Sequence, residues 1–429
     1  MTANPTARSN PTRGRWPLAC AAVLLQLALG AVYAWSVFAK ALKAPESAFH
    51  LSASEAALPF SVTIGMIFVG TYIGGRIQDH RGPRLVALTG GVIYSVGILL
   101  ASVSSDHGQF WLLVLGYGVI GGFGLGLGYI VPIAMLQKWF PDKRGLITGI
   151  AVGGFGFGAI ITSPIAQQLV DANKVVPTRA FLPLGLGYLV MTLVGAAFFR
   201  NPPAGYAVPG FTPRVTEQAG GGRDYSQGEA LRTPQWYLLT AILTLNVTAG
   251  IGLISVAADS ATSVAGYSKA AAASLVGALG LFNGGGRIFW GWFSERIGRM
   301  RAFLGMLVIQ AACFLIIPHA SSAALFAVLA ALVYLCYGGG FGAMPATAGD
   351  FFGIRNAGAI YGLMIVGWSL GGVLGPQLVA GLVNGDSYTT AFTVIALVAL
   401  AATVLPLITR PAGAGTTTDR VVTEGSAPG

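Results

Sequence analysis

One arginine, Arg287, lies in the middle of a long apolar stretch, and no other charged residue lies as deep in such a stretch. A charge in membrane hydrocarbon costs about 2.5–3.5 kcal/mol on insertion scales, so it is kept where it faces a partner, a water-filled cavity or a ligand. Asn283 precedes it by four residues and shares its helix face. A guanidinium matches a carboxylate through two parallel hydrogen bonds. This pair therefore predicts a binding site for a small anion.

The elements that position this pair must be membrane-spanning helices. Of the 429 residues, 54% are hydrophobic and only 9% are charged. Soluble domains carry roughly 25% charged residues. Twelve apolar stretches approach or exceed the roughly 20 residues that cross a bilayer. The composition predicts an all-α membrane protein with twelve transmembrane helices.

The predicted helices form two six-helix bundles. We expect a cytoplasmic N-terminal segment at 1–15, one bundle at 16–200, a cytoplasmic linker at 201–235, a second bundle at 236–409 and a cytoplasmic tail at 410–429. The linker is rich in Pro, Gly and charge, a composition that does not bury a core. The helices are expected at 16–42, 56–78, 84–104, 110–137, 145–172, 179–200, 236–259, 269–293, 300–318, 322–345, 357–383 and 387–409.

Positive charge predicts the orientation. With the N-terminus inside, nineteen of the 25 Lys and Arg residues lie in inside segments and five in outside loops. Such an excess marks the cytoplasmic side. We therefore expect a multi-pass protein of the cytoplasmic (inner) membrane with both termini in the cytoplasm and the lipid bilayer as partner. Because the basic residues occupy short loops between apolar segments, the net charge of +10 does not indicate a nucleic-acid partner.

The two bundles repeat one pattern. GRIQDHRGPR at 75–84 matches GWFSERIGRM at 291–300, an offset of 216 residues, and WFPDKRG at 139–145 matches FFGIRNAG at 351–358. Such repeats are the plan of many secondary transporters. The offset makes Thr71 and Ile67 the counterparts of Arg287 and Asn283, so the fold itself requires no charge there. The alternative is that Arg287 extends to the interface, since only eight residues, roughly 12 Å, separate it from Glu295.

The loop after the second helix has the pattern G-x-x-x-D-x-x-G-x-R, which resembles the signature of the major facilitator superfamily. Narrower patterns resemble the oxalate:formate antiporter family and its monocarboxylate-transporting relatives: YAWSVF (33–38), KWFPDKRG (138–145), NPPAGY (201–206), LNVTAGIGLIS (245–255) and LFNGGGRIFWGW (281–292). The residues of the loop pattern are Gly75, Asp79, Gly82 and Arg84, and those of its second copy are Glu295, Gly298 and Arg299.

The resemblance implies roles for these residues. It implies that Arg287 binds a substrate carboxylate. It also implies that the loop pattern is a gate latch, in which the acid pairs with an arginine across the interface between the halves and is released when they rock. The alternative for the loops is an ordinary positively charged cytoplasmic connection.

Trp368 marks a departure from the family pattern. The resemblance implies that transporters of oxalate carry a lysine at this place in the eleventh helix, which gives two cations for two carboxylates. With Arg287 alone, a dianion would enter the site undercompensated, which is costly. The substitution therefore favours a monocarboxylate; the alternative is that Trp368 only packs.

Tyrosines are the remaining candidates for the pocket wall. The family's central cavity is lined by the first, fourth and tenth helices, in which Tyr33, Tyr129 and Tyr337 lie. A phenol can donate a hydrogen bond to a carboxylate or a 2-hydroxyl while its ring forms part of the wall. For each tyrosine alone, ordinary packing is an equal alternative.

Asp259 is the candidate proton carrier. Many proton-coupled relatives have an acid one turn before the binding arginine, but Asn283, which does not titrate, holds that place here. Asp259 is the remaining acid near the seventh and eighth helices, and an ordinary exposed acid at a helix end is the alternative.

These features predict a transporter of small monocarboxylates such as lactate or pyruvate, working by alternating access, with a proton or a counter-anion as coupled partner. The alternative is an antiporter of the oxalate and formate type. A membrane sensor would need a soluble signalling domain, and an enzyme a catalytic constellation; the sequence shows neither. The glycine clusters at 121–128, 153–158 and 338–342 lie inside apolar helices and are not phosphate loops. No cofactor and no metal site are expected.

Overall fold

The computed structural model describes residues 14–211, 224–320, 322–383 and 387–411, and all the elements in these ranges are helices. The first six membrane helices are built from α1 (Arg15–Leu29), η1 (Gly30–Ala34) and α2 (Trp35–Leu42); α3 (Ala53–Arg81); α4 (Pro83–Ala101); η2 (His107–Gln109), α5 (Phe110–Leu113), η3 (Val114–Gly121) and α6 (Gly122–Trp139); α7 (Arg144–Asp171); and η4 (Pro177–Ala180) with α8 (Phe181–Ala197).

After the short α9 (Gln227–Ala230), the second six are α10 (Pro234–Ala265); α11 (Lys269–Ile297); α12 (Arg299–Ile316) with η5 (Ile317–His319); α13 (Ala323–Phe352); α14 (Ala357–Met364) with α15 (Val366–Leu382); and α16 (Thr389–Ala402) with α17 (Val404–Ile408). Eleven of these twelve are long and apolar enough to cross a membrane. The twelfth, α11, is equally long and continuous, but Asn283 and Arg287 interrupt its apolar sequence.

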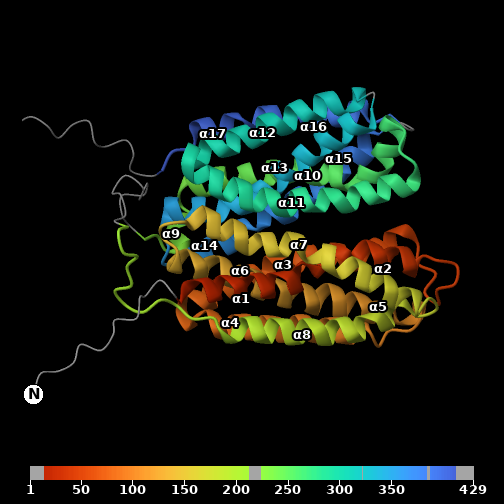
Figure 1. The fold of residues 1–429 in the computed structure, drawn as a ribbon, viewed down its shortest axis with the longest axis horizontal. Coiled ribbons are helices and arrows are strands. Elements are labelled where there is room, and N and C mark those ends of the chain that lie inside the picture. The colour runs from red at the N-terminus through yellow and green to blue at the C-terminus, as the bar shows by residue number, and fades with distance from the viewer. Residues whose placement is uncertain (1–13, 212–223, 321, 384–386, 412–429) are drawn as a thin grey trace, which may run out of the picture.

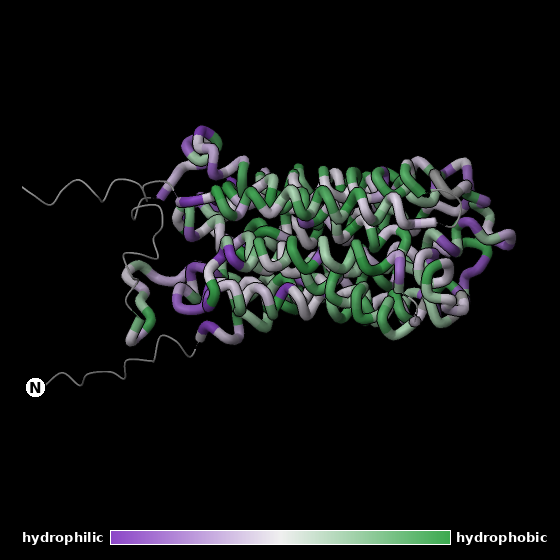
Figure 2. Tube along the Cα trace, turned by 90° about the horizontal axis from the view of Figure 1, so that it is seen from above, coloured by the Kyte–Doolittle hydropathy of each residue, from purple (hydrophilic) through white to green (hydrophobic). Residues whose placement is uncertain are grey.

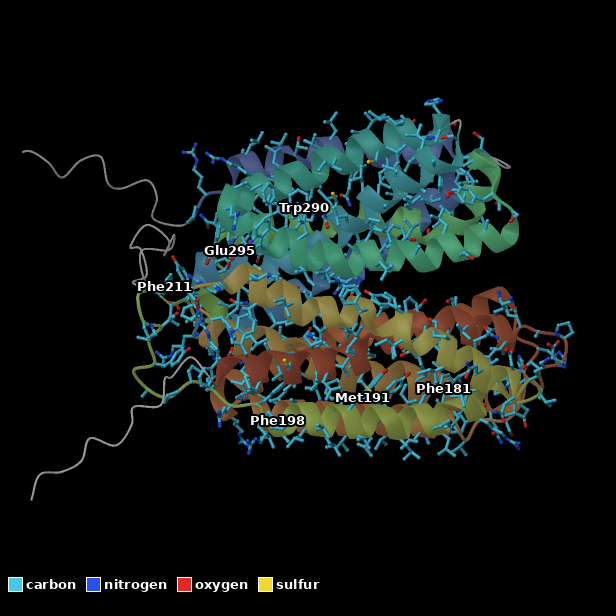
Figure 3. The ribbon with its side chains drawn as sticks, viewed as in Figure 1. Phe181, Met191, Phe198, Phe211, Trp290 and Glu295 are labelled. Carbon is cyan, nitrogen blue, oxygen red and sulfur yellow. The ribbon has the colours of Figure 1, made fainter. Side chains whose placement is uncertain are left out.

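The two sets of helices lie side by side as two bundles (Figure 1). The hydrophilic segments gather at the two ends of the bundles, with apolar helices between them, as expected for a protein that crosses a bilayer (Figure 2). We call the end that carries α9 and α14 the linker end, and the opposite end the far end. Glu295 lies at the linker end, and Phe181 of α8 lies toward the far end (Figure 3).

Glycines of the repeated loops turn the chain at the linker end. Gly82 follows α3 with φ +86°, and Gly298 follows α11 with φ +94°. This backbone conformation carries a steric penalty for residues with a Cβ atom, which explains why both loop copies need glycine. The next helix starts at once in each case, at Pro83 and Arg299.

Two helix pairs join the halves near the linker end, and glycine allows both close approaches. In the first crossing, α3 meets α14: a Cβ on Gly75 would lie 2.2 Å from the carbonyl oxygen of Gly358. In the second crossing, α7 meets α11: a Cβ on Gly145 would lie 2.1 Å from the carbonyl oxygen of Gly291. Such distances leave no room for a side chain, so the backbones themselves are in contact.

The second crossing ends before the far end. Gly277, Gly284 and Gly291 are seven residues apart and so lie on one face of α11. A Cβ on Gly284 or Gly291 would clash with α7, whereas a Cβ on Gly277 would meet nothing within 4 Å. The halves are therefore in contact at the linker end and apart along this face toward the far end.

The expected bounds agree with the structure within a few residues, with two larger differences. The tenth helix was expected to end at Pro345, but α13 continues to Phe352. The seventh was expected to end at Asp259, but α10 continues to Ala265. A proline inside a transmembrane helix is tolerated because neighbouring helices satisfy the freed backbone groups. Most of the expected terminal segments, 1–13 and 412–429, lies outside the described residues.

Candidate substrate site

Arg287 is completely buried between the two halves. Its Nε donates to Asn283 Oδ1 at 3.4 Å, Nη1 donates to the Val152 carbonyl at 3.3 Å, and Nη2 donates to the Tyr33 hydroxyl at 3.5 Å. These distances are long for hydrogen bonds, and two of the five guanidinium N–H groups have no acceptor among the described residues. The side chain does not extend to the interface, and it keeps donors free for an anion.

No carboxylate among the described residues pairs with Arg287; aromatic rings surround it instead. The guanidinium carbon lies 4.8 Å from the centre of the Phe341 ring and 5.5 Å from that of Phe155. Both distances suit cation–π attraction, which stabilises a desolvated cation by about 2 kcal/mol. Because rings offset part of the charge without neutralising it, the site stays attractive to an anion.

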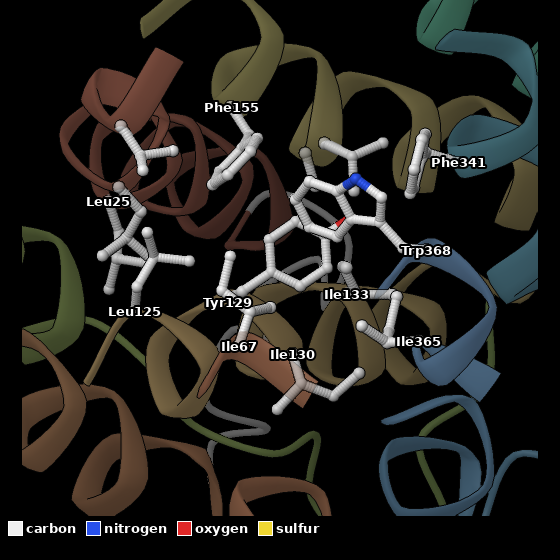
Figure 4. Close-up of a cluster of buried hydrophobic side chains, with 14 of the residues drawn as sticks. Leu25, Ile67, Leu125, Tyr129, Ile130, Ile133, Phe155, Phe341, Ile365 and Trp368 are labelled. Carbon is white, nitrogen blue, oxygen red and sulfur yellow. The ribbon is translucent and has the colours of Figure 1, made fainter. Parts of the chain in front are cut away.

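Trp368 closes the wall of this site. Its ring centre lies 5.1 Å from that of Phe341, 6.0 Å from Phe155, 6.1 Å from Tyr129 and 6.5 Å from Tyr33. Tyr129, Phe155, Phe341 and Trp368 can be followed in the close-up (Figure 4). We call Arg287 and these five rings the aromatic box: Tyr33, Tyr129, Phe155, Phe341 and Trp368.

Irregular helix segments position two walls of the aromatic box. Tyr33 lies in η1, where the first membrane helix tightens into a 3-10 segment. Trp368 lies in the first turn after the break at Ile365 that separates α14 from α15. Interrupted helices near the membrane midplane, where they line a cavity, are common in secondary transporters.

Further tyrosines lie at the edge of the aromatic box. Tyr337 is buried, is near enough to Arg287 for electrostatic interaction, and packs against α10, where a Cβ on Gly250 would lie 2.5 Å from its side chain. Tyr129 and Tyr361 are buried near each other, and neither hydroxyl has a hydrogen-bond partner of ordinary geometry among the described residues. A buried hydroxyl without a partner is costly and leaves a group that a bound ligand could satisfy.

Three residues of this region, Phe155, Phe341 and Tyr361, were not predicted from the sequence. A signal existed for the two phenylalanines, because each follows directly on glycines in a cluster inside an apolar helix, GGFGFG and GGGFG. Small neighbours let helix backbones approach closely, which brings a large ring into the centre of a bundle.

Asp259 is not part of the aromatic box. It is exposed in the last two turns of α10, nine residues, or about 13 Å along the helix, beyond Gly250. No hydrogen bond or ion pair of its carboxylate is present among the described residues; only its backbone carbonyl accepts, from Thr262.

Asp79 and Glu295 reach across the two crossings, but not to the partners expected. Asp79 accepts from the Ala359 amide at 2.9 Å, and Glu295 accepts from the Gly145 amide. The expectation of an arginine across the interface was therefore wrong for both acids. Each faces the amide groups of a helix N-terminus, of α14 or of α7, where unpaired N–H groups and the helix dipole attract a carboxylate.

The cations of these sites come from the acids' own halves. Lys138 Nζ lies 3.4 Å from Asp79, and Arg299 Nη2 lies 3.8 Å from Glu295. Arg84 is exposed and has no ion-pair partner among the described residues. In the part of the chain that the structure describes, the arginine that pairs across the halves is Arg144, 3.0 Å from Asp350, which also pairs with Arg299 at 2.8 Å.

A family model matches both halves. Residues 20–258 and 240–422 match the model of the Major Facilitator Superfamily. Together these matches cover nearly the whole described chain.

Curated relatives include transporters of organic acids. The chain is 30% identical over 412 residues to the oxalate:formate antiporter of Oxalobacter formigenes, covering 92% of this chain and 93% of the relative. It is 28% identical over 366 residues to the uncharacterised MFS-type transporter YhjX of Escherichia coli, covering 85% and 87%. It is 25% identical over 437 residues to the apicoplast pyruvate carrier 1 of Toxoplasma gondii, covering 88% and 78%.

Solved structures share the fold at low identity. The proton:xylose symporter XylE has a TM-score of 0.72 at 15% identity, covering 92% of this chain and 95% of that one. The E. coli fucose:proton symporter FucP has a TM-score of 0.69 at 15% identity, covering 93% and 99%.

Proposed function

This chain belongs to the major facilitator superfamily and is a transporter rather than an enzyme, and we propose that it moves small monocarboxylates, such as lactate or pyruvate, by alternating access. The observation that carries the proposal is Arg287, a fully buried cation with free donors and no carboxylate partner in the described chain. A carboxylate bound there would accept two parallel hydrogen bonds. The surrounding rings suit a small apolar body.

The number of cations supports a monoanion. Arg287 is the single cation of the aromatic box, and Trp368 occupies the place where the family pattern leads us to expect a lysine. A second carboxylate would lie against aromatic rings without a counter-charge, at considerable cost. Asn283, which accepts from Arg287 Nε, would orient the guanidinium.

The orientation follows from the charge distribution. The linker end carries the excess of basic residues, so we assign it to the cytoplasmic side of the inner membrane. Both chain termini would then lie in the cytoplasm. The structure then represents a state closed toward the cytoplasm, with the halves apart on the outer side.

The energy source is proposed to be a proton gradient in symport. The second candidate is exchange of two carboxylates, which the relative named an oxalate:formate antiporter favours. Formate carries a single charge, so an exchanger that accepts it also suits a one-cation site. Asp259 stays a candidate proton carrier, and no contact of its carboxylate with the described residues supports the role.

Uptake by purified protein in proteoliposomes tests the proposal. Labelled lactate would be offered with and without an inward proton gradient, and to vesicles preloaded with formate or oxalate. Accumulation driven by the proton gradient is expected. Uptake that requires a preloaded anion would establish exchange, and uptake in neither condition would overturn the substrate class.

Arg287→Lys is the matched variant for this assay. Lysine keeps the charge but replaces the planar fork with a point charge, so transport should nearly vanish. Uptake at the parent rate would mean that Arg287 does not bind the carboxylate through two parallel hydrogen bonds.

A further inference from the structure

Asp79 lies between one group from each half of the molecule. Lys138, on α6 of its own half, is 3.4 Å away, and the amide of Ala359, in the first turn of α14, donates to it at 2.9 Å. The side chain is 2% exposed, so both partners matter for its desolvated charge. The placement of Lys138 and Ala359 therefore determines the strength of this contact.

The first end of the linker fixes the residue next to Lys138. The indole Nε1 of Trp139 donates to the carbonyl of Arg200 at 2.7 Å. The carbonyl of Trp139 accepts from the Tyr206 hydroxyl at 3.0 Å, and the two rings pack edge to face with centres 5.0 Å apart. This end of α6 is thus tied to the linker through Tyr206 and to Arg200, the residue just before the linker.

The second end of the linker fixes the corner that contains Ala359. The amide of Tyr225 donates to the Phe352 carbonyl at 2.9 Å, and Asn356 Nδ2 donates to the Tyr225 carbonyl at 2.7 Å. Gln227 Nε2 donates to the carbonyl of Ala359 at 2.9 Å. The amide of Ala359 therefore donates a hydrogen bond to Asp79, and its carbonyl accepts one from Gln227 of the linker. The described part of the linker is docked on the bundles, which its composition did not predict.

The equivalent acid of the second crossing has no such support. Glu295 accepts from the Gly145 amide and pairs with Arg299, and none of the linker residues that the structure describes contacts these groups. The halves are alike in their acids and helix ends, but the linker contacts one crossing.

We propose that the linker is a positioning element for the Asp79 contact and thereby stabilises the state closed at the linker end. Its two ends hold Lys138 and the first turn of α14 in the places where Asp79 meets both. A helix N-terminus that is already oriented binds a carboxylate without further loss of conformational freedom. The inference requires alternating access, but it does not depend on which substrate is carried.

The test measures the distance between the halves at the linker end in the full chain. Spin labels would be placed at Arg84 and Arg301, both exposed, in a Cys20→Ser background, because the other cysteines are buried. Pulsed dipolar spectroscopy in nanodiscs without substrate gives the ratio of open to closed molecules. Gln227→Ala should raise that ratio roughly two- to threefold, the lower end of the effect of losing one hydrogen bond, because the Asp79 contact is loosened and not removed.

Two backgrounds separate the proposed route from a general loss of packing. In Asp79→Ala, Gln227→Ala should have little further effect, because the contact that it positions is gone. In Glu295→Gln, its effect should be undiminished, since unconnected sites add. Equal effects of Gln227→Ala in both backgrounds would overturn the proposal, as would no effect of Gln227→Ala in the parent.

Tyr206→Phe tests the first end of the linker with less risk to folding. It removes the donor to the Trp139 carbonyl and keeps the ring contact, so the open fraction should rise in the same direction as in Gln227→Ala. An unchanged distance distribution would contradict a role for this end.

Discussion

The first and second crossings use the same backbone geometry for different purposes. Each pairs a glycine of a loop motif with a glycine at the start of a partner helix, and each has an acid facing helix amides. One residue in each lies at the level of the site: Thr71 donates to the Gly362 carbonyl at 2.9 Å, and Arg287 donates to the Val152 carbonyl at 3.3 Å. The neutral hydroxyl completes a contact between halves, whereas the guanidinium reaches the carbonyl of Val152, about one turn beyond the equivalent Gly149, and keeps two donors free. The candidate site thus lies beside one of two symmetry-related contacts between the halves, and only that one carries a charge.

Making the crossings alike should have the largest effect. Arg287→Thr copies Thr71, so it should keep a contact to the opposite half and lose the anion. Two charge-assisted hydrogen bonds contribute about 1.5–3 kcal/mol each, which predicts a loss of transport of at least about 100-fold. Thermal stability should change little, because removal of an unpaired buried charge offsets the cavity that the shorter side chain leaves. Uptake and a melting curve measured on one preparation check both expectations, and retained uptake would contradict the role of Arg287.

The glycine contacts test whether both crossings must close. Gly75→Ala and Gly291→Ala each place a Cβ within 2.5 Å of a backbone carbonyl of the other half, so each should slow transport about tenfold or more. Gly285→Ala is the control, because a Cβ there meets nothing within 4 Å and alanine favours the helix. A Gly75→Ala variant as active as Gly285→Ala would mean that the first crossing does not need this close approach.

A second cation would change the comparison at the aromatic box. α15 continues α14, the helix of the first crossing. Trp368→Lys would place a second positive charge on α15, in the same aromatic box as Arg287. Competition of labelled lactate uptake by oxalate should then improve about tenfold, the effect of a close charge pair. An unchanged inhibition profile would remove the one-cation argument for monocarboxylates.

The acids should give the smallest effects, and unequal ones. Asp79 is 2% exposed and Glu295 is 24% exposed, so Asp79→Asn removes a better shielded charge than Glu295→Gln. We expect a shift of the linker end toward the open state of about threefold to fivefold for Asp79→Asn and less for Glu295→Gln. Spin-label distances check this order, and the reverse order would contradict it.

Hydropathy and motif spacing were enough to predict the architecture. Apolar length places a helix within a few residues, and the repeated loops relate Thr71 to Arg287. Arg287 and its polar neighbours could also be predicted, because a cation in hydrocarbon is rare. Phe155 and Phe341 could not, since an aromatic residue in an apolar helix has the same composition around it whether it faces the core or the lipid.

The partners of Asp79 and Glu295 were beyond the sequence for another reason. A backbone amide has no residue type, so a contact between a carboxylate and a helix N-terminus leaves no signature at the receiving position. An arginine of the opposite half was the expected partner, but among the described residues Arg144 pairs across the halves with Asp350, and Arg84 has no ion-pair partner. The same reason conceals Gln227, whose acceptor is a backbone carbonyl.

The glycine face of α11 also determines the mechanics of the molecule. Along this face, contact with α7 ends between Gly284, which lies near the middle of α11, and Gly277. From Gly284 the helix extends thirteen residues, about 20 Å, to the linker end and fifteen residues, about 22 Å, to the far end. A lever with nearly equal arms moves its two ends by nearly equal amounts, so a rotation about Gly284 that separates one end by several ångströms closes the other by the same distance.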